Sequence, residues 1–188
     1  MSQYHIQNPG ERGLLELAAA ELARNPRAST AAIARACGIG RATLNRKFTS
    51  RRALLEAIAL DALGQVDEIA AAHANATTAS EYLAAMLEPL VLLGDRFRVL
   101  DQDPDLNALP EIRERLEEHR RFTIDLARRL KAESALDPAV PDAFFAAALD
   151  GLLFSAWVGI ADGHIAVRDA PGLIHRVLFQ GLQSPRPS

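Results

Sequence analysis

Apolar residues recur at helical spacing along most of this chain, and no stretch of useful length alternates as a half-buried strand would. In residues 11–24, for example, Leu14, Leu15, Ala18 and Leu22 fall on one helix face. The pattern therefore predicts an all-α fold. The predicted helices span about 11–24, 29–36, 40–47, a long segment from Ser50, and then 78–100, 109–134, 141–162 and 170–182.

Local signals mark the ends of these helices. Ser29 and Ser50 are good N-caps, because a short hydroxyl side chain can accept a hydrogen bond from a free backbone N–H. Pro26 follows the first helix and ends it, and Gly38 supplies a turn because glycine adopts positive φ without a steric penalty. Pro89 lies inside the fifth predicted helix and should kink or split it.

Composition agrees with a folded, globular protein. The chain has 188 residues, of which 49% are hydrophobic and 24% charged, so one sizeable core or two smaller ones can form. Its one cysteine excludes a disulfide within the chain and favours a cytoplasmic location. The stretch Met1–Gly10 is polar and lacks the apolar core of a signal peptide.

One segment, Phe144–Ala161, is almost as apolar and as long as a short membrane span. Asp150 lies inside it, Asp142 and Asp162 flank it, and no basic residue adjoins it. A helix that is apolar on all sides also suits the interior of a helical bundle or dimer. We therefore expect a buried helix here and no membrane partner.

The charge is divided unevenly along the chain. The total is −3, yet residues 1–60 carry nine basic and four acidic side chains, whereas residues 61–188 carry twelve basic and twenty acidic ones. Residues 24–52 hold eight basic side chains and no Asp or Glu. A basic segment on an acidic protein indicates a partner with a phosphate backbone.

The segment Ile33–Phe48 reads as two short helices joined by a tight turn at Cys37–Ile39, which is the spacing of a helix-turn-helix. Leu44 and Phe48, four residues apart, would face inward and anchor the second helix. Its outward face would then carry Arg41, Ala42, Asn45 and Arg46.

These outward side chains suit the reading of base edges. Arginine can donate twice to guanine, and Asn45 can pair with adenine in a bidentate way. Ala42 and the methyl group of Thr43 are small enough to admit close approach or to touch a thymine methyl group. Ser29, Thr43, Lys47 and Arg51 lie at or near helix ends that can face phosphate.

The stretch from about Leu14 to Leu55 resembles the DNA-binding domain of the TetR family of bacterial transcriptional regulators. The matching residues are Ile33-Ala34, Cys37-Gly38-Ile39, Thr43-Leu44, Phe48, Ser50 and Leu54. With this domain, we expect Arg41, Ala42, Thr43 and Asn45 to read bases and Ser29, Arg46, Lys47 and Arg51 to hold phosphates, and the sequence leaves open whether Asn45 reads a base or contacts phosphate.

This sequence departs from the family pattern at several positions. Gly40 replaces the customary serine, so the helix after the turn starts with a weaker cap. Asn45 and Lys47 replace a tyrosine and a histidine that commonly touch phosphate in relatives, and Asn45 is free to read a base instead. Arg51 replaces a lysine and keeps its charge.

The resemblance also implies a division of the chain. Residues 1–55 would form the helix-turn-helix domain, residues 56–183 a helical domain for ligand binding and dimerisation, and residues 184–188 a disordered tail. Family members bind palindromic DNA as homodimers, act most often as repressors, and are released from DNA by a small-molecule effector. The sequence does not identify the effector, the operator, or whether transcription is repressed or activated.

The last two predicted helices carry apolar stripes that suit a four-helix dimer interface, although the same stripes could complete the monomer core. The predicted interface residues are Leu149, Leu152, Leu153, Ala156, Trp157, Ile160, Leu173, Val177 and Leu178.

A second apolar stripe suits an effector pocket, although such a stripe is more often plain core. The candidate pocket residues are Tyr82, Met86, Leu90, Leu93, Phe97, Phe122, Leu126, Asp150 and Phe154. Asp150 is an acidic residue in an apolar helix, which is costly unless it is paired. It could meet a cationic or hydrogen-bonding ligand, or an arginine or helix end across a dimer.

No catalytic constellation, cofactor fingerprint or metal-ligand spacing is present in the sequence. We therefore predict a regulator that is not an enzyme and uses no cofactor or metal. The alternatives are a helical module for small molecules or proteins that has lost specific DNA reading and, more remotely, an enzyme with a helical body. A screen for preferred DNA sites distinguishes the first alternative from a regulator.

Overall fold

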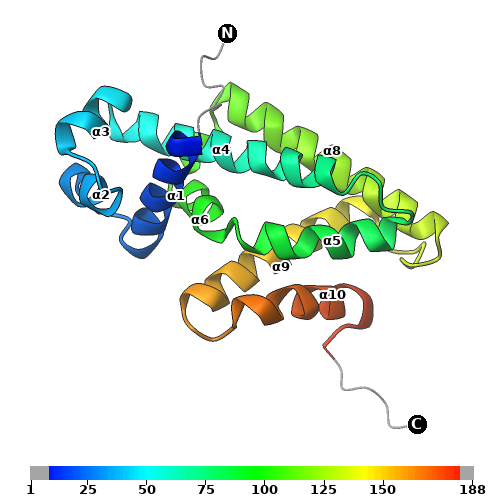
Figure 1. The fold of residues 1–188 in the computed structure, drawn as a ribbon. Helices are drawn as coiled ribbons and strands as arrows, with labels where there is room; N and C mark the ends of the chain where they lie inside the picture. The colour runs from blue at the N-terminus through cyan, green and yellow to red at the C-terminus, as the bar shows by residue number, and fades with distance from the viewer. Residues whose placement is uncertain (1–8, 183–188) are drawn as a thin grey trace. The chain divides into compact units, whose positions relative to one another are not determined.

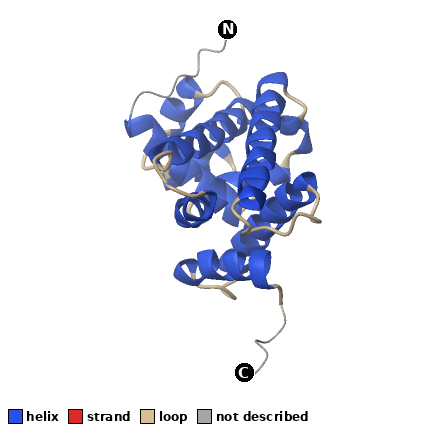
Figure 2. Ribbon diagram, turned by 90° about the vertical axis from the view of Figure 1, so that its right-hand side faces the viewer, coloured by secondary structure: helices blue, strands red, loops and turns tan. Residues whose placement is uncertain are grey.

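The computed structural model describes residues 9–182, and every regular element in that range is helical (Figures 1 and 2). The all-α prediction is confirmed. The predicted tail at 184–188 lies outside the described residues, as do the first eight. The elements are α1 (Pro9–Arg24), α2 (Thr30–Ala36), α3 (Arg41–Lys47), α4 (Arg51–Ala72), α5 (Ala79–Val91), α6 (Gly94–Gln102), α7 (Pro104–Asn107), α8 (Pro110–Ala132), α9 (Asp142–Ala161), the short 3-10 helix η1 (Val167–Asp169) and α10 (Ala170–Gln180).

The predicted caps are present. The Ser29 hydroxyl accepts a hydrogen bond from Ala32 N at 3.2 Å, and the Ser50 hydroxyl accepts one from Ala53 N at 3.1 Å. Gly40 precedes α3 and makes no side-chain cap, as expected from its missing hydroxyl. Side-chain caps therefore mark where α2 and α4 begin, and α3 begins without one.

The helix predicted over 78–100 is two helices, since the chain breaks at Leu92 and Leu93 between α5 and α6. Pro89 near the end of α5 has no N–H for the ladder, and its ring disturbs the preceding turn. The predicted split is therefore confirmed. The short elements α7 and η1 lie in segments where no helix was expected, because three or four residues are too few to display a period.

The chain divides into two compact units. The first runs through Asp67 and includes Leu93–Leu116, so it holds α1 to α3, most of α4, and α6 and α7. Its core is continuous from α1 to the start of α8. The fully buried large side chains of this core are Leu15, Leu22, Ile33, Leu44, Ile58, Leu63, Leu106 and Ile112.

This unit is larger than the predicted domain of residues 1–55. The apolar run of α4 stays buried through Leu63, and Val99 and Leu106 join the same core from segments that lie later in the chain. Packing between distant segments makes this unit larger than the helix-turn-helix domain that the resemblance implies.

The second unit consists of Glu68–Leu92 and the chain from Glu117 onward. Within it α5 packs against α9 and α10. The indole Nε1 of Trp157 donates to the carbonyl of Val91 at 3.1 Å, and Phe145, Leu149 and Leu153 of α9 are buried. These contacts place one face of α9 in the interior of the unit.

By length and composition alone, α9 is able to cross a membrane, and it is the only helix within residues 9–182 that meets this criterion. A core helix of a folded protein meets the same criterion. The opposite face of α9 stays exposed, with Phe144 at 65% and Phe154 at 39% of their accessible surface. The helix is therefore buried on one face, and its other face exposes two phenylalanines beside Asp150.

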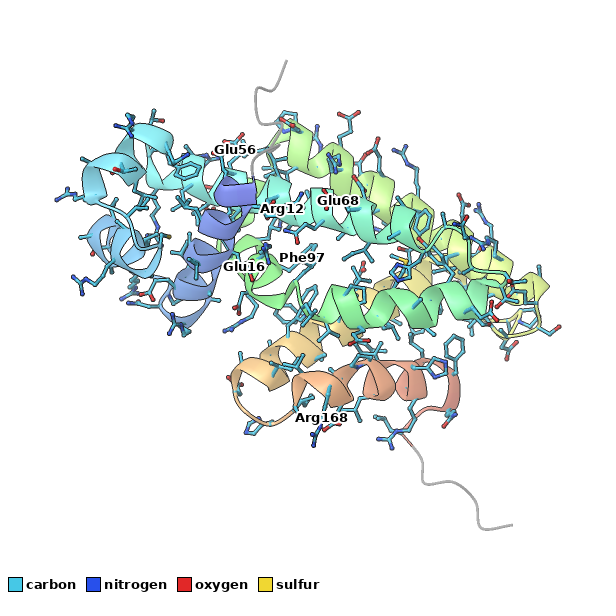
Figure 3. All side chains as sticks on the ribbon, in the orientation of Figure 1. Arg12, Glu16, Glu56, Glu68, Phe97 and Arg168 are labelled. Carbon is cyan, nitrogen blue, oxygen red and sulfur yellow. The ribbon has the colours of Figure 1, made fainter. Side chains whose placement is uncertain are left out.

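A charged network lies inside the first unit, where α1 packs against α6 (Figure 3). Arg96 Nε of α6 donates to Asp61 Oδ2 of α4 at 3.1 Å, and Gln65 Nε2 donates to the same oxygen at 2.6 Å. Arg96 Nη2 also lies 3.5 Å from Glu16 Oε2, and Arg12 Nε lies 3.5 Å from Asp61 Oδ1. The side chains of Asp61 and Arg96 are 1% and 6% exposed, so α1, α4 and α6 meet around a buried ion pair.

Burial raises the pKa of the Asp61 carboxyl, and the Arg96 guanidinium is the largest influence that opposes this rise. Among the described residues no hydrogen bond reaches Asp61 Oδ1. The negative charge of Asp61 in this core therefore depends mainly on Arg96.

Candidate DNA-binding surface

The helix-turn-helix has the predicted geometry. The turn between α2 and α3 is closed by hydrogen bonds from Gly38 N to Arg35 O and from Ile39 N to Ala34 O, both at 3.0 Å. Gly38 takes φ +67°, in the left-handed region that favours glycine. Buried Leu44 holds α3 against the core, so the remaining faces of α3 point outward.

Replacing Gly38 with alanine is expected to lower the free energy of unfolding by about 1–2 kcal/mol, because an L side chain is strained at positive φ. No atom lies within 4 Å of the added Cβ, so the cost comes from the backbone alone. Urea denaturation followed by circular dichroism measures the change. Gly40→Ala is the matched control, since Gly40 has φ −72° and its added Cβ meets only Thr43 Oγ1 at 3.9 Å. Equal losses in the two variants would contradict the strain argument.

The outward face of α3 carries the side chains expected to read bases. Arg41, Ala42, Asn45 and Arg46 are exposed, and Thr43 is half-buried. Within the described part of the chain, neither Arg41 nor Arg46 has an ion-pair or hydrogen-bond partner for its guanidinium. Both cations are therefore available to an anionic partner.

The other predicted phosphate-binding side chains already have partners inside the protein. The Ser29 hydroxyl caps α2. Lys47 Nζ lies 3.9 Å from Glu11 Oε1 of α1, with both side chains more than a third exposed. Arg51 donates to the carbonyls of Ala28 and Pro26, which turns its guanidinium onto the loop before α2.

Sequence reasoning missed Glu11 as a neighbour of Lys47, and it missed the buried pair of Asp61 and Arg96. A signal for the second was available, because Asp61 interrupts an apolar helix in the same way as Asp150. No sequence signal points to Glu11, since it lies one helix away and 36 positions earlier than Lys47.

The predicted effector-pocket residues fall into both units. Tyr82, Met86, Leu90 and Leu126 are buried in the second unit, whereas Leu93 and Phe97 belong to the first. Leu93 is buried and Phe97 packs on the core of the first unit.

Tyr82 contacts Phe122, another candidate pocket residue of the second unit. Its ring lies 5.8 Å from that of exposed Phe122, the Arg129 guanidinium lies 5.7 Å from its centroid, and its hydroxyl donates to Ala70 O at 3.4 Å. Burial raises the pKa of the Tyr82 hydroxyl, and Arg129 opposes this rise. The phenol is therefore neutral at physiological pH.

Asp150 and Phe154 lie on the exposed face of α9. Protein atoms around the Asp150 carboxyl nevertheless raise its pKa, while Arg120 and His119 of α8 act in the opposite direction. The groups that lower the pKa of Asp150 thus come from α8 of the same chain, the helix that precedes α9.

The predicted dimer residues divide by exposure. Leu149, Leu153, Ala156 and Trp157 are buried within the second unit and are part of its own core. The partly exposed members are Leu152, Ile160, Leu173, Val177 and Leu178. The exposed apolar side chains of α9 at Phe144 and Phe154 were not in the predicted set.

Cys37 is half-buried, and its thiol donates to Leu14 O at 3.6 Å. Burial raises its pKa, so the reactive thiolate is disfavoured. Among the side chains that the structure describes, no group of three or more His, Cys, Asp or Glu residues is placed to hold a metal ion.

The N-terminal part of the sequence matches the model of a known protein family. Residues 14–58 match the sequence model of the bacterial regulatory proteins of the tetR family. No curated protein matches the sequence. The matched segment covers α2, α3, most of α1 and the start of α4, which together form the helix-turn-helix and its support.

Solved structures share the fold over nearly the whole length. The TetR-like transcriptional regulator LfrR from Mycobacterium smegmatis, in complex with proflavine, has a TM-score of 0.76 at 20% identity and covers 94% of this chain and 98% of its own. The fatty acid degradation regulator FadR from Bacillus halodurans has a TM-score of 0.73 at 18% identity, with coverages of 95% and 99%. A ketosteroid transcriptional regulator of Mycobacterium tuberculosis has a TM-score of 0.72 at 17% identity, with coverages of 95% and 98%.

A helical protein with an exposed basic recognition helix on a helix-turn-helix is a DNA-binding transcriptional regulator. Residues 14–58 are similar to the N-terminal segment of tetR-family regulatory proteins, and the chain as a whole shares its fold with solved transcriptional regulators such as the TetR-like LfrR.

Proposed function

We propose that the chain acts as a homodimeric, ligand-responsive repressor that binds a palindromic operator. The observation that carries this proposal is the exposed face of α3, where Arg41 and Arg46 flank small or amide side chains and lack partners within residues 9–182. Two copies of α3 would enter successive major grooves about 34–36 Å apart. We assign base reading to Arg41, Ala42, Thr43 and Asn45, and phosphate binding to Ser29, Arg46 and Lys47.

The 3.9 Å separation of Lys47 and Glu11 supports an exchange of partners on binding DNA. An exposed pair of this kind contributes little to stability, so Lys47 can turn to a phosphate at small cost. Glu11 would then keep Lys47 close to the rim of α3 in the free protein.

The decisive experiment selects preferred sites from random duplex DNA at two salt concentrations. Recovery of one inverted repeat supports a two-fold reader and supplies the operator. Weak, salt-sensitive binding without a preferred sequence would contradict the proposal and favour a helical module that only touches phosphates.

On the selected operator, Arg41→Ala is expected to cost about 1–3 kcal/mol of binding free energy and to relax preference at one base pair. Lys47→Ala should weaken binding evenly across sequences and reduce the slope of log affinity against log salt by about one. Fluorescence anisotropy on the operator and on scrambled DNA measures both quantities. An equal loss on every sequence from both variants would contradict this assignment of roles.

The exposed apolar face of α9 supports dimerisation. It carries Phe144 and Phe154, with small residues and the exposed Asp150 between them, and α10 adds the partly exposed Leu173, Val177 and Leu178. Two-fold symmetry of the dimer would match the two-fold symmetry of a palindrome.

The second unit supports an effector site around Tyr82, where buried apolar side chains adjoin an aromatic pair and the Arg129 cation. LfrR in complex with proflavine shares the fold and supports a small-molecule effector for this chain. We propose Met86, Leu90, Phe122 and Leu126 as further lining residues, whereas Asp150 and Phe154, which were also predicted to line the pocket, lie on the exposed face of α9.

This proposal makes the protein a regulator without catalytic activity. A regulator that binds chromosomal DNA must lie in the same compartment as that DNA, so we also propose a cytoplasmic location.

A further inference from the structure

Arg51, the first residue of α4, makes two side-chain hydrogen bonds to the loop that precedes α2. Its Nη1 donates to Ala28 O at 2.7 Å and its Nη2 donates to Pro26 O at 2.6 Å. One guanidinium thus joins two carbonyls of the loop between α1 and α2 to the first residue of α4. Charge-assisted hydrogen bonds of this length are stronger than neutral ones.

Both carbonyls lie outside the ladder of α2. Its first internal bond runs from Ile33 N to Ser29 O, so Ala28 O and Pro26 O precede the helix. Ala28 itself is 3% exposed. A buried carbonyl needs a donor, and the Arg51 fork supplies one from a distant part of the chain.

These two hydrogen bonds explain why the positive charge of Arg51 stands at the start of α4. A cation at the N-terminus of a helix is unfavourable, because the helix dipole is positive there, and the first turn of α4 contains no acidic side chain. The two carbonyl oxygens offset that cost. The side chain is therefore held where its hydrogen bonds are, and it is not simply solvated at the helix end.

The hydrogen bonds of Arg51 join the two segments that flank α2 and α3. Residues 26–28 lie immediately before α2, and Arg51 follows α3 after the short connection Phe48–Ser50. The hydrogen bonds consequently close the segment that carries α2 and α3 into a ring. The two ends of the segment that contains α2 and α3 are therefore hydrogen-bonded to each other, while buried Leu44 and Ile33 hold its middle against the core.

We infer that Arg51 is a positioning residue, which closes this ring and sets the orientation of α3 for base reading. The inference rests on the proposed DNA-binding function and replaces a phosphate contact at this position. A ring that is closed in the free protein presents α3 already ordered, so specific binding loses less conformational freedom. Binding to phosphates alone needs no such order.

The test compares Arg51→Lys and Arg51→Ala with the wild-type chain on the selected operator and on scrambled DNA. Lysine keeps the charge but cannot hold both carbonyls at once. We expect both variants to lose about tenfold in the ratio of specific to non-specific affinity. Their salt slope on the operator should stay within about 0.5 of the wild-type slope.

Arg46→Ala is the matched comparator, because Arg46 is an exposed arginine on α3 and has no ion-pair partner in the described part of the chain. It should lower the salt slope by about 0.9 and leave the specificity ratio nearly unchanged. The positioning role is overturned if Arg51→Lys behaves as wild type while Arg51→Ala behaves as Arg46→Ala.

A measurement without DNA separates this inference from the proposed function. Amide hydrogen exchange at Ala32 and Ile33, in the first turn of α2, should be about tenfold faster in Arg51→Lys than in the wild-type chain. If the wild-type chain selects no DNA site, the proposed function fails and this readout alone decides whether Arg51 orders α2. Unchanged exchange would overturn the positioning role.

Discussion

Replacing Arg96 with alanine is expected to lower the free energy of unfolding by about 3–5 kcal/mol. The variant leaves the carboxylate of Asp61 buried at 1% exposure without its closest cation, and Glu16 loses a partner as well. Gln65 keeps its hydrogen bond to Asp61, so the loss should fall near the lower end of this range. Urea denaturation followed by circular dichroism measures it.

Arg98→Ala in the same helix is the matched control, because it removes a half-buried arginine that has no ion-pair partner within residues 9–182. It should cost less than about 1 kcal/mol. A double variant, Asp61→Leu with Arg96→Met, removes both charges and should recover most of the stability. Equal losses from Arg96→Ala and Arg98→Ala would show that the buried pair does not stabilise the first unit.

The loss in Arg96→Ala should also depend on pH. Without the guanidinium, the folded-state pKa of Asp61 rises further above its ordinary value of 3.8, because burial is no longer opposed by its largest counterweight. A raised folded-state pKa means that stability falls as pH increases from the unfolded pKa through the folded one. The difference from wild type should therefore be larger near neutral pH than at about pH 4. A difference that is independent of pH would contradict a further rise in the folded-state pKa of Asp61.

The second large effect concerns the exposed face of α9. Replacing Phe144 and Phe154 together with aspartate should convert the proposed dimer into a folded monomer, because the aromatic side chains are 65% and 39% exposed and hold no core position. Affinity for the inverted repeat should fall by about 100- to 10,000-fold, since the two half-sites are then bound independently. Sedimentation velocity measures the oligomeric state, and anisotropy measures affinity for the full and half sites.

Leu92→Asp is the control for this experiment, because it introduces aspartate at another exposed apolar residue of the second unit, at the end of α5. It should remain dimeric and keep its affinity for the full site. Retention of a dimer by the α9 double variant would place the dimer contact elsewhere.

The sequence alone was enough to predict most of the helices, the caps of α2 and α4, and the helix-turn-helix. These features depend on neighbours within four residues: the Ser29 cap bonds three positions ahead, and Leu44 and Phe48 share a face through helical spacing. The outward face of α3 follows from the same period. For that reason, the exposed set of Arg41, Ala42, Asn45 and Arg46 could be predicted without a structure.

Residue type and position predicted a phosphate contact for Arg51, but the tertiary structure turns that side chain onto carbonyls 23 and 25 positions away. The same holds for the Lys47 and Glu11 pair and for the Asp61 and Arg96 pair, which are 36 and 35 positions apart.

The sequence by itself therefore determined the fold class, the recognition helix and its outward side chains, because local backbone hydrogen bonds and helical periodicity encode them. Only the tertiary structure decided which long polar side chains meet, and that Leu93 and Phe97 belong to a different unit from Tyr82. The physical reason is that a flexible arginine or lysine reaches many positions, and its partner is chosen by packing between segments far apart in the chain.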